Sequence, residues 1–559
     1  MKQLFIFVII ALLYYKGFSF ESTQSKDTSI WSLKTPSLYL KWEAEKGVPL
    51  VWKVQNEEGK GEKEWYFFIT GPEKGDVIFQ HLSIQGVLGG KDIYLIANNS
   101  SQTDIDQSVS NKVVYSYSFD NNGLELKQVF EENGYPYHFN MSVILSNNAA
   151  EEFSVLPSDS LVLVLGPGLG QIKSDQQEIP RSMYYYVEPV ASLNGNVYKH
   201  VADTLKAGVL PWKSEELQWI GLHNRYFALL ILPNKSKDFS VTLPFLQSFI
   251  NYDSFSSEQQ LPAHDLPVLS FQLPVLSLEP GENVQWNFTI FSGPKSYDAL
   301  RAGPENLNSL LFSDLWSWMR WICLGLYRLL SIIHFFIPNW GWSIIMLALI
   351  VRIALYPVAQ KAQKSQNRFI EAQKQMLPEL SEIKKNYKGG ERSEQILQLY
   401  KKHNVSPFAG LKPLLVVLIQ LPILIALFHV LGTAFELRDT SFLWIETLSE
   451  PDQLFSFGVN IPFLGEYFNL LPFLMAVVTL ITFKLSPAPT AEKKNQRLQN
   501  IFLLVMTLIF FFLFYNFPAG MVLYWTFANV FHIVQQRLMM RRKQKNSVNT
   551  FLKNKANTF

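Results

Sequence analysis

The sequence predicts a multidomain membrane protein: an exported antiparallel β-sandwich, then an α-helical transmembrane core of five helices, with an N-terminal signal anchor ahead of both. Three observations support this fold class. The chain has 559 residues, more than one ordinary domain, and 48% of them are hydrophobic. Its first half alternates polar and apolar residues with a period of two. Its second half contains apolar runs of the length of membrane-spanning helices.

Net charge and cysteine content narrow the function classes. A formal net charge of +2 provides no chain-wide basic field for nucleic acid. The single cysteine, Cys323, excludes an intrachain disulfide framework, a CxxC redox site and a cysteine-rich metal site. We therefore predict no metal and no cofactor.

Residues 1–20 are predicted to be a transmembrane signal anchor. A lysine precedes an apolar run from Leu4 to Tyr15, which has the length of a signal-peptide core. Because no small-x-small cleavage site follows, a retained anchor is favoured over a cleaved signal peptide, which stays the alternative. Either one exports the segment that follows.

Residues 21–313 are predicted to form the β-sandwich. In VYSYSFDNNGLELKQVF, apolar side chains alternate on both sides of Asn122-Gly123, which is the pattern of a β-hairpin. Two later strands alternate in the same way, at Phe139, Met141, Val143, Leu145 and at Val284, Trp286, Phe288, Ile290. Because strands recur without amphipathic helices between them, an antiparallel sandwich is favoured over an α/β fold.

Nothing in this domain predicts an enzyme. The glycine-rich stretches GVLGGKD and GPGLG lack the lysine and hydroxyl residue of a phosphate-binding loop, so we interpret both as turns. Metal-ligand spacing is missing from the five histidines, His81, His138, His200, His223 and His264. Trp212 and Trp219 could bind a sugar, but core packing is the favoured interpretation for both.

Residues 314–338 are predicted to form an interfacial amphipathic helix. The segment is apolar, yet it carries the charged or polar residues Arg320, Arg328 and His334 and the tryptophans Trp316, Trp318 and Trp321. These features suit a helix lying at the bilayer surface. An extra span here would also place the next basic segment on the external side.

Five further spans follow from the apolar runs. The predicted segments are TM2 (339–358), a cytoplasmic helical hairpin (359–407), TM3 (408–433), an external loop (434–467), TM4 (468–485), a cytoplasmic loop (486–498), TM5 (499–517), TM6 (518–537) and a basic cytoplasmic tail (538–559). With the anchor, this gives six spans with both ends inside, and every basic cluster lies on one side. The run from Leu470 to Phe483 makes only about 21 Å of helix. We expect local bilayer thinning there, with burial against neighbouring helices as the alternative.

The predicted cytoplasmic hairpin is amphipathic. One helical stripe consists of Phe369, Ala372, Met376, Leu380, Ile383 and Tyr387, and a second begins after the break at Lys388-Gly389-Gly390. The basic face could contact ribosomal RNA or anionic lipid, although positive-inside anchoring alone would explain the lysines nearest the membrane. The predicted contact residues of hairpin and tail are Lys361, Lys364, Arg368, Lys384, Lys385, Arg541 and Arg542.

A set of motifs occurs in a fixed order between residues 315 and 540. They are GWSIIMLALIVRIALYP, the basic hairpin, VSPFAGLKPLLVVLIQLPILIALFHVL, FLWIETLSEPD and FPAGMVLYWTFANVFHIVQQ. This order resembles the YidC/Oxa1/Alb3 membrane-protein insertase family. The exported domain resembles, more loosely, that of Gram-negative YidC through its placement, its size and the stretch FSGPKSYDAL. The resemblance implies a multi-pass protein of the bacterial inner membrane whose β domain is periplasmic.

The family resemblance implies a membrane insertase and chaperone, not an enzyme, that passes nascent membrane proteins through a hydrophilic groove into lipid. The implied groove and client-binding residues are Arg352, Gln420, Pro422, Ile423, Phe517, Tyr524 and Trp525. Implied partners are nascent membrane proteins, the Sec translocon (SecYEG and SecDF), the phospholipid bilayer and, through the hairpin, the ribosome and the signal-recognition-particle receptor. Two positions depart from the family pattern, because Ala348 replaces a usual threonine and Trp525 a common tyrosine, which makes a less polar groove.

Three alternatives stay open. Arg352 lies five residues before Pro357, so its side chain could snorkel to the headgroups instead of facing a groove. A secondary transporter could bind an anion at Arg352, but the sequence lacks paired intramembrane charges and an internal repeat. An envelope scaffold could act through its β domain, although a single span would suffice to anchor it.

Overall fold

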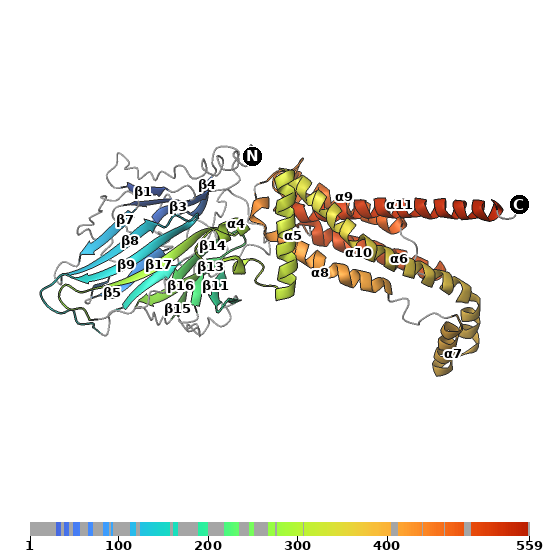
Figure 1. Cartoon of the computed structure of the whole chain (residues 1–559), viewed down its shortest axis with the longest axis horizontal. Coiled ribbons are helices and arrows are strands. Elements are labelled where there is room, and N and C mark those ends of the chain that lie inside the picture. The colour runs from blue at the N-terminus through green and yellow to red at the C-terminus, as the bar shows by residue number, and fades with distance from the viewer. Residues whose placement is uncertain are drawn as a thin grey trace, which may run out of the picture. The chain divides into compact units, whose positions relative to one another are not determined.

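The computed structural model describes residues 30–34, 38–43, 49–55, 65–70, 82–88, 91–92, 112–118, 123–156, 160–165, 188–198, 217–233, 245–250, 266–273, 277–305, 307–403, 412–438, 440–462, 464–485 and 493–556. The chain divides into two compact units, Met1–Asp314 and Leu315–Phe559 (Figure 1). The predicted signal anchor, Trp212 and the histidines at 81, 200 and 264 lie outside the described residues.

The described residues of the first unit form three antiparallel sheets. The largest has eight strands in the order β12-β11-β13-β14-β17-β9-β8-β7. Its strands are β7 (Lys112–Ser118), β8 (Leu124–Glu132), β9 (His138–Asn147), β11 (Glu188–Leu193), β12 (Asn196–Tyr198), β13 (Leu217–His223), β14 (Phe227–Pro233) and β17 (Asn283–Pro294). All of its strand pairs are antiparallel, so the antiparallel β domain predicted from the sequence is confirmed.

Two smaller sheets complete the described part of this unit. A five-stranded sheet, in the order β15-β16-β10-β5-β6, consists of β5 (Leu82–Leu88), β6 (Lys91–Asp92), β10 (Ser160–Leu165), β15 (Phe245–Ile250) and β16 (Leu266–Leu273). A four-stranded sheet consists of β1 (Ile30–Lys34), β2 (Leu38–Glu43), β3 (Pro49–Gln55) and β4 (Trp65–Thr70).

The core of the eight-stranded sheet follows the predicted alternation. Strands β9 and β17 pair in a register that places Met141 opposite Phe288 and Val143 opposite Trp286, and all four side chains are buried. Every second residue therefore faces the same side, as the period of a strand requires. Trp219 is only 2% exposed, so it packs in the core and offers no exposed face to a sugar.

Strands β7 and β8 pair as an antiparallel hairpin, as predicted, and Gly123 directly precedes β8. Gly123 has φ +60°, and a Cβ there would lie 2.6 Å from the backbone nitrogen of Ala149. Glycine is therefore required by both the backbone conformation and the close approach of the neighbouring chain.

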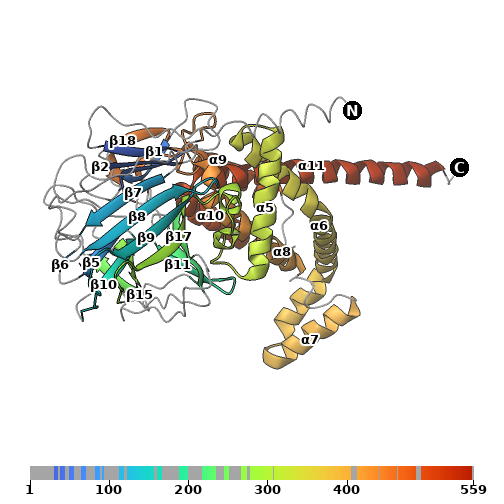
Figure 2. The same ribbon diagram turned by 60° about the vertical axis from the view of Figure 1, so that its left-hand side comes forward.

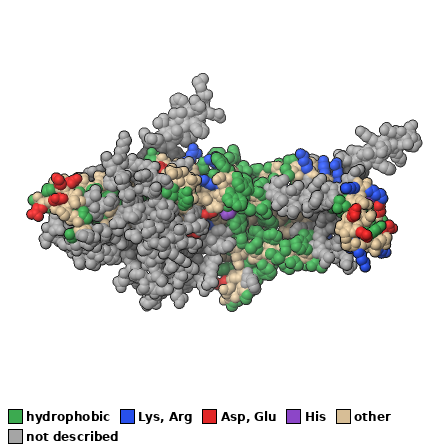
Figure 3. Space-filling model, turned by 90° about the horizontal axis from the view of Figure 1, so that it is seen from below, with side chains coloured by type: hydrophobic (Ala, Val, Ile, Leu, Met, Phe, Trp, Pro, Cys, Tyr) green, Lys and Arg blue, Asp and Glu red, His purple; other side chains and the backbone are tan. Residues whose placement is uncertain are grey.

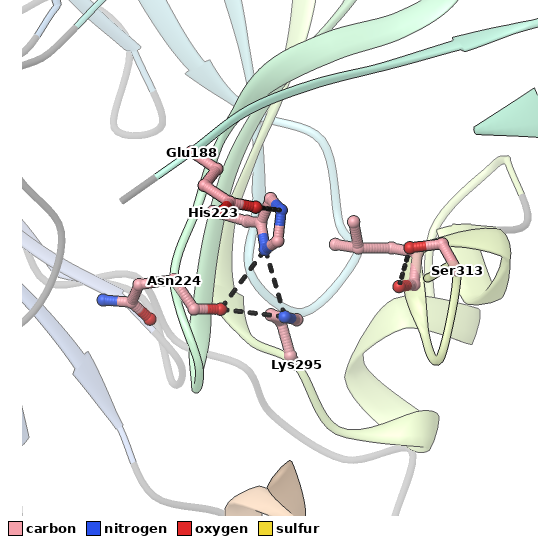
Figure 4. Close-up of polar contacts among 6 residues, drawn as sticks. Glu188, His223, Asn224, Lys295 and Ser313 are labelled. Carbon is pink, nitrogen blue, oxygen red and sulfur yellow. Dashed lines mark hydrogen bonds and ion pairs between the residues drawn. The ribbon is translucent and has the colours of Figure 1, made fainter. Parts of the chain in front are cut away.

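A buried polar cluster fixes the chain that follows β17 (Figure 4). Lys295 Nζ donates a hydrogen bond to the backbone oxygen of Asn224 at 2.8 Å and lies 3.1 Å from Nδ1 of His223. Glu188 Oε2 lies 3.9 Å from Nε2 of the same histidine. Ser296 then caps helix α4 (Tyr297–Arg301) by accepting from the amide of Ala299 at 3.2 Å. The FSGPKSYDAL stretch thus joins the last strand to its neighbours and to a helix.

His138 is buried at the start of β9, beside a glycine. Its Nδ1 lies 2.6 Å from the carbonyl oxygen of Pro136, which can only accept, so Nδ1 carries the proton of the neutral ring. Nε2 is buried without a hydrogen-bond partner in the described part of the chain, and a Cβ on Gly303 would lie 2.2 Å from it. Burial lowers the pKa of His138, although the bond to Pro136 opposes this effect.

The described residues of the second unit are mainly helical and include one small sheet. Its helices are α5 (Ser317–Phe336), α6 (Trp340–Asn386), α7 (Gly389–Lys402), α8 (Lys412–Thr433), α9 (Leu470–Leu485), α10 (Lys493–Tyr515) and α11 (Ala519–Ala556). Helix α6 packs against α5, α8 and α11, and α11 packs also against α8 and α9. Helix α9 packs in addition against α10. Helix α6, which carries Arg352, is therefore in contact with α8 and α11, the two helices that carry most of the other predicted groove residues.

The helices extend beyond the predicted spans. Helix α6 continues for 47 residues through Pro357 and Pro378, so the predicted TM2 (339–358) and the first helix of the hairpin belong to one helix. A proline removes one backbone hydrogen bond, but the unbroken bonds before and after it keep the helix continuous. Helix α10 begins at Lys493, not at residue 499, and α11 extends beyond residue 537 to Ala556. Hydropathy marks where apolar residues stop, whereas Lys, Gln and Arg remain good helix formers.

The predicted helical hairpin is present at the glycine break. Helix α6 ends at Asn386, Gly389 adopts φ +62°, and α7 folds back beside the end of α6 (Figure 2). Met376 of α6 and Leu399 of α7 are both buried, so the apolar stripes serve to pack the hairpin.

The predicted external loop also contains structure that the sequence analysis did not anticipate. Strands β18 (Phe455–Ile461) and β19 (Gly465–Phe468) form an antiparallel two-stranded sheet directly before α9. A short 3-10 helix, Phe435–Leu437, follows α8.

Among the described residues, two helical segments are long and apolar enough to cross a membrane: Ser317–Phe336 and Trp340–Lys361. Three shorter apolar helices are Leu421–Thr433, Leu470–Thr482 and Ile501–Tyr515. The first long segment is α5, which the sequence analysis interprets as interfacial. The aromatic residues at its two ends are strongly exposed, including Trp316, Trp321, Phe335 and Phe336.

Candidate functional site

Arg352 lies on α6, and its side chain is hydrogen-bonded to a residue of α11. The side chain comes from the apolar first part of the helix, four residues after the fully packed Ala348. Its Nη2 is hydrogen-bonded to Nδ1 of His532. Its Nε is buried and has no hydrogen-bond partner within the described part of the chain. A cationic group with unused donors is thus held between two helices.

His532 and Gln536 continue this polar contact along α11. The two residues are four apart, so they lie on one face of the helix, and the Gln536 side-chain nitrogen is 3.1 Å from Nε2 of His532. Neither residue was predicted from the sequence. The available signal was two polar side chains, spaced by one turn, near the end of the predicted TM6 (518–537).

Tyr524 is the second polar neighbour of the arginine. It lies on α11 two turns before His532, is buried, and interacts electrostatically with Arg352. The structure therefore brings together two of the residues named from sequence, Arg352 and Tyr524, and adds His532 and Gln536.

Aromatic residues form a second part of the candidate site. Phe517, just before α11, contacts Phe428 of α8 with ring centroids 5.4 Å apart and Phe514 of α10 at 5.0 Å. Trp525 contacts Phe514 at 5.6 Å and Phe510 at 6.0 Å. The predicted residues Phe517 and Trp525 are thus linked through Phe514 in one aromatic row across three helices.

The α8 residues of the predicted site are less well connected. Pro422 and Ile423 are half-buried within α8, next to the exposed Leu421. The Gln420 side chain lies outside the described residues, so its expected place in the groove stays a prediction.

A small cavity lies between α9, α10 and α11, apart from the arginine. It encloses about 120 Å³ and is lined by Met475, Ala476, Thr479, Thr482, Thr507, Phe510, Trp525 and Asn529. Asn529 donates to the hydroxyl of Thr479 at 3.2 Å, whereas the other two threonine hydroxyls bond to carbonyls of their own helices. Asn529 therefore makes the interhelical hydrogen bond that membrane helices commonly use.

The hairpin presents a basic surface at one end of the helical unit (Figure 3). Its predicted contact residues Lys361, Lys364, Arg368, Lys384 and Lys385 are all exposed. Arg541 and Arg542 belong to α11, but their side chains lie outside the described residues.

An ion pair ties the two hairpin helices together. Glu379 of α6 lies 2.7 Å from Nζ of Lys402 and 3.4 Å from Nε2 of His403. The hydrogen bond from Lys402 is the main cause that lowers the pKa of Glu379, with a further contribution from His403.

Comparisons with known proteins indicate the family to which the chain belongs. A family described as 60Kd inner membrane protein matches residues 332–546, and a YidC periplasmic domain family matches residues 93–329. A Chlamydia trachomatis protein named membrane protein insertase YidC is 31% identical over 341 residues, covering 57% of this chain and 42% of the relative. The same name belongs to a relative from Blochmanniella floridana, 26% identical over 453 residues, covering 80% of this chain and 71% of the relative.

One solved structure, an active YidC insertase crystal structure with its first transmembrane domain resolved, aligns over 96% of this chain and 97% of its own, with 17% identity and a TM-score of 0.33. The alignment to the Chlamydia relative spans less than half of that relative's length. Together, the two family matches account for the β domain and the helical unit. The chain belongs to the YidC/Oxa1 family of membrane protein insertases and includes a YidC periplasmic domain.

Proposed function

We propose that this protein inserts nascent membrane proteins into the bacterial inner membrane and assists their folding. The observation that carries the proposal is the position of Arg352. A guanidinium from an apolar helix is held at the α6–α11 contact by His532, within a unit whose outer helical surface is apolar. A charge in such a position is expensive in lipid and is a functional-site hypothesis by default.

The apolar outer surface supports contact with lipid. Helix α10 exposes large apolar side chains on several sides: Ile501, Phe502, Leu504, Val505, Leu508, Ile509, Phe512 and Leu513. Continuous exposed apolar surface of this kind marks a membrane-contacting region. We infer that α6, α8, α9, α10 and α11 are the five spans of the transmembrane core, with residues 1–20 as a sixth.

The proposed mechanism needs no covalent chemistry. Arg352 attracts the acidic or polar flank of a client segment, which lowers the barrier to moving polar residues through hydrocarbon. The apolar part of the client then enters lipid along α8 and α11, past Phe517 and Trp525. The free energy released by burying the client's apolar surface, about 25 cal/mol per Å², drives the transfer.

The contact with His532 supports a groove role for Arg352 over snorkelling. A snorkelling side chain extends toward the headgroups, whereas this guanidinium is hydrogen-bonded to a neighbouring helix. Its Nε is buried and has no hydrogen-bond partner among the described residues, as a charge placed for function and not for packing would leave it.

We further propose that the basic hairpin contacts the ribosome, and that the protein works alone or beside the Sec translocon. The support is the exposed row of lysines and Arg368 on the hairpin, which is held in shape by Glu379 and Lys402. Clusters of this kind bind phosphate-rich surfaces in a salt-dependent way.

Charge reversal at Arg352 tests the proposal. Purified Arg352→Glu protein, reconstituted in liposomes, should fold but insert clients with acidic flanks about tenfold more slowly, equal to about 1.4 kcal/mol. Clients with basic flanks should be affected less, and Arg352→Lys should retain most activity because the charge is kept. A folded Arg352→Glu protein that inserts both client types at the parental rate would contradict the groove mechanism.

A further inference from the structure

The β18–β19 hairpin exposes an apolar surface beside the external end of α9. Leu454, Phe455 and Val459 are 41%, 51% and 64% exposed, which is unusual for a short hairpin in contact with water. Ser456 donates a hydrogen bond to Glu466 at 3.2 Å, so the hairpin also carries a polar edge. The hairpin is therefore amphipathic, and its apolar side chains are left exposed.

A ladder of aromatic rings joins this hairpin to the helices. Phe455 stacks on Phe468 with centroids 4.9 Å apart, and Phe468 stacks on Phe473 of α9 at 5.1 Å. Phe473 in turn contacts Phe511 of α10 at 4.8 Å. The hairpin is therefore packed onto the first turn of α9 and does not project freely into solvent.

The same ladder continues the exposed apolar stripe of α9. That stripe consists of residues at helical spacing on one face: Phe473, Leu474, Val477, Leu480 and Ile481. Helix α9 has 16 residues and is about 24 Å long, several ångströms short of a hydrocarbon core of about 30 Å. The rings of Phe468 and Phe455 add apolar surface beyond the N-terminal end of this short helix.

We propose that the β18–β19 hairpin lies in the outer-leaflet interface of the bilayer and extends the lipid-contacting surface of α9. Aromatic side chains prefer this depth, and the polar Ser456–Glu466 pair remains at the headgroups. The hairpin compensates for the short helix, so the bilayer thins less than α9 alone would require. The inference depends on membrane location only and is independent of insertase activity.

Site-specific fluorescence in vesicles tests this proposal. Full-length protein with Cys323→Ser and Val459→Cys, labelled with an environment-sensitive dye, is reconstituted in phosphatidylcholine and phosphatidylglycerol vesicles. Acyl chains brominated near the glycerol backbone should quench most of the emission at this position, while aqueous iodide on both sides should quench little. The control is Glu446→Cys, an exposed acidic position in the same external segment, which should show the reverse pattern.

Paired substitutions make the result specific to the ladder. Phe455→Asp in the labelled protein should abolish most lipid quenching, whereas Ser456→Asn on the polar edge should leave it unchanged. Equal iodide quenching at positions 459 and 446 would place the hairpin in water and overturn the proposal. Protection from iodide without lipid quenching would instead indicate contact with a second copy of the chain, and would overturn it equally.

Discussion

Arg352 and His532 are 180 residues apart in the sequence and are hydrogen-bonded through Nη2 and Nδ1 across the α6–α11 contact. Because a guanidinium can only donate, Nδ1 must accept, and the neutral ring carries its proton on Nε2. The Gln536 amide therefore presents its oxygen to the ring, which requires a half-turn of the amide group. The three residues form a directed chain from the arginine into α11.

The first prediction concerns this chain. His532→Leu removes the acceptor of Arg352 and should slow insertion of clients with acidic flanks several-fold, because the guanidinium loses its fixed position. His532→Gln supplies a side-chain oxygen at similar reach and should restore much of the rate. The measurement is insertion in proteoliposomes with acidic- and basic-flank clients. If His532→Leu reduced both client types equally and glutamine gave no rescue, the histidine would have only a packing role.

The second prediction concerns the hairpin. Ile383 is half-buried on the apolar stripe of α6, so Ile383→Asp should loosen the packing of α6 on α7 and reduce insertion. Lys384→Ala, on the exposed neighbouring residue, should leave packing intact and produce a smaller, salt-sensitive loss of ribosome association. Co-sedimentation with ribosomes at two salt concentrations separates these effects. Unchanged insertion by Ile383→Asp would mean that the ordered hairpin is dispensable.

The third prediction is a pH dependence of β-domain stability. Because burial lowers the pKa of His138 in the folded protein, the unfolded chain binds more protons below about pH 6.5. Stability should be constant above that value and fall as the pH is lowered from 6.5 toward the folded pKa. His138→Phe should remove this step, as measured by urea unfolding of the detergent-solubilised protein.

A matched glycine pair provides the control for that site. Gly303→Ala should destabilise the β domain by about 1–3 kcal/mol, because the new methyl group meets the buried ring of His138. Gly390→Ala, where a Cβ meets nothing within 4 Å, should have little effect. If the two substitutions had equal effects on stability, the close approach of residue 303 to His138 would not be the cause of the destabilisation.

The fourth prediction concerns topology. A reporter fused at the Lys388-Gly389-Gly390 break should be cytoplasmic, and one fused near Asp452 should be external, because the basic hairpin belongs on the inside. Alkaline phosphatase and green fluorescent protein fusions distinguish these locations. An external reporter at the glycine break is incompatible with six spans.

The sequence predicted those parts of the fold that local pattern determines. Alternation at Phe139 to Leu145, the pairing of β7 with β8 and the break at Gly389 depend on neighbouring residues, and the structure contains each of them.

The candidate site was only partly predictable for a different reason. Arg352 and Tyr524 stand out within apolar segments, but their meeting depends on how α6 packs on α11, which no local pattern encodes. His532 was not predicted, because its hydrogen bond to Arg352 depends on the same packing. The β18–β19 hairpin was missed because Gly458 and Gly465, both at positive φ, interrupt a strand pattern that was already short.

Because α6 is continuous, a movement of the hairpin is transmitted along one helix to Arg352. From Pro357 to Asn386 the helix is about 44 Å long, and Pro357 lies only five residues from Arg352. A tilt of this segment by about 5° at Pro357 displaces Asn386 by about 4 Å. We therefore expect a force on the basic end of α6 to tilt the segment that carries the guanidinium, because no loop lies between the two.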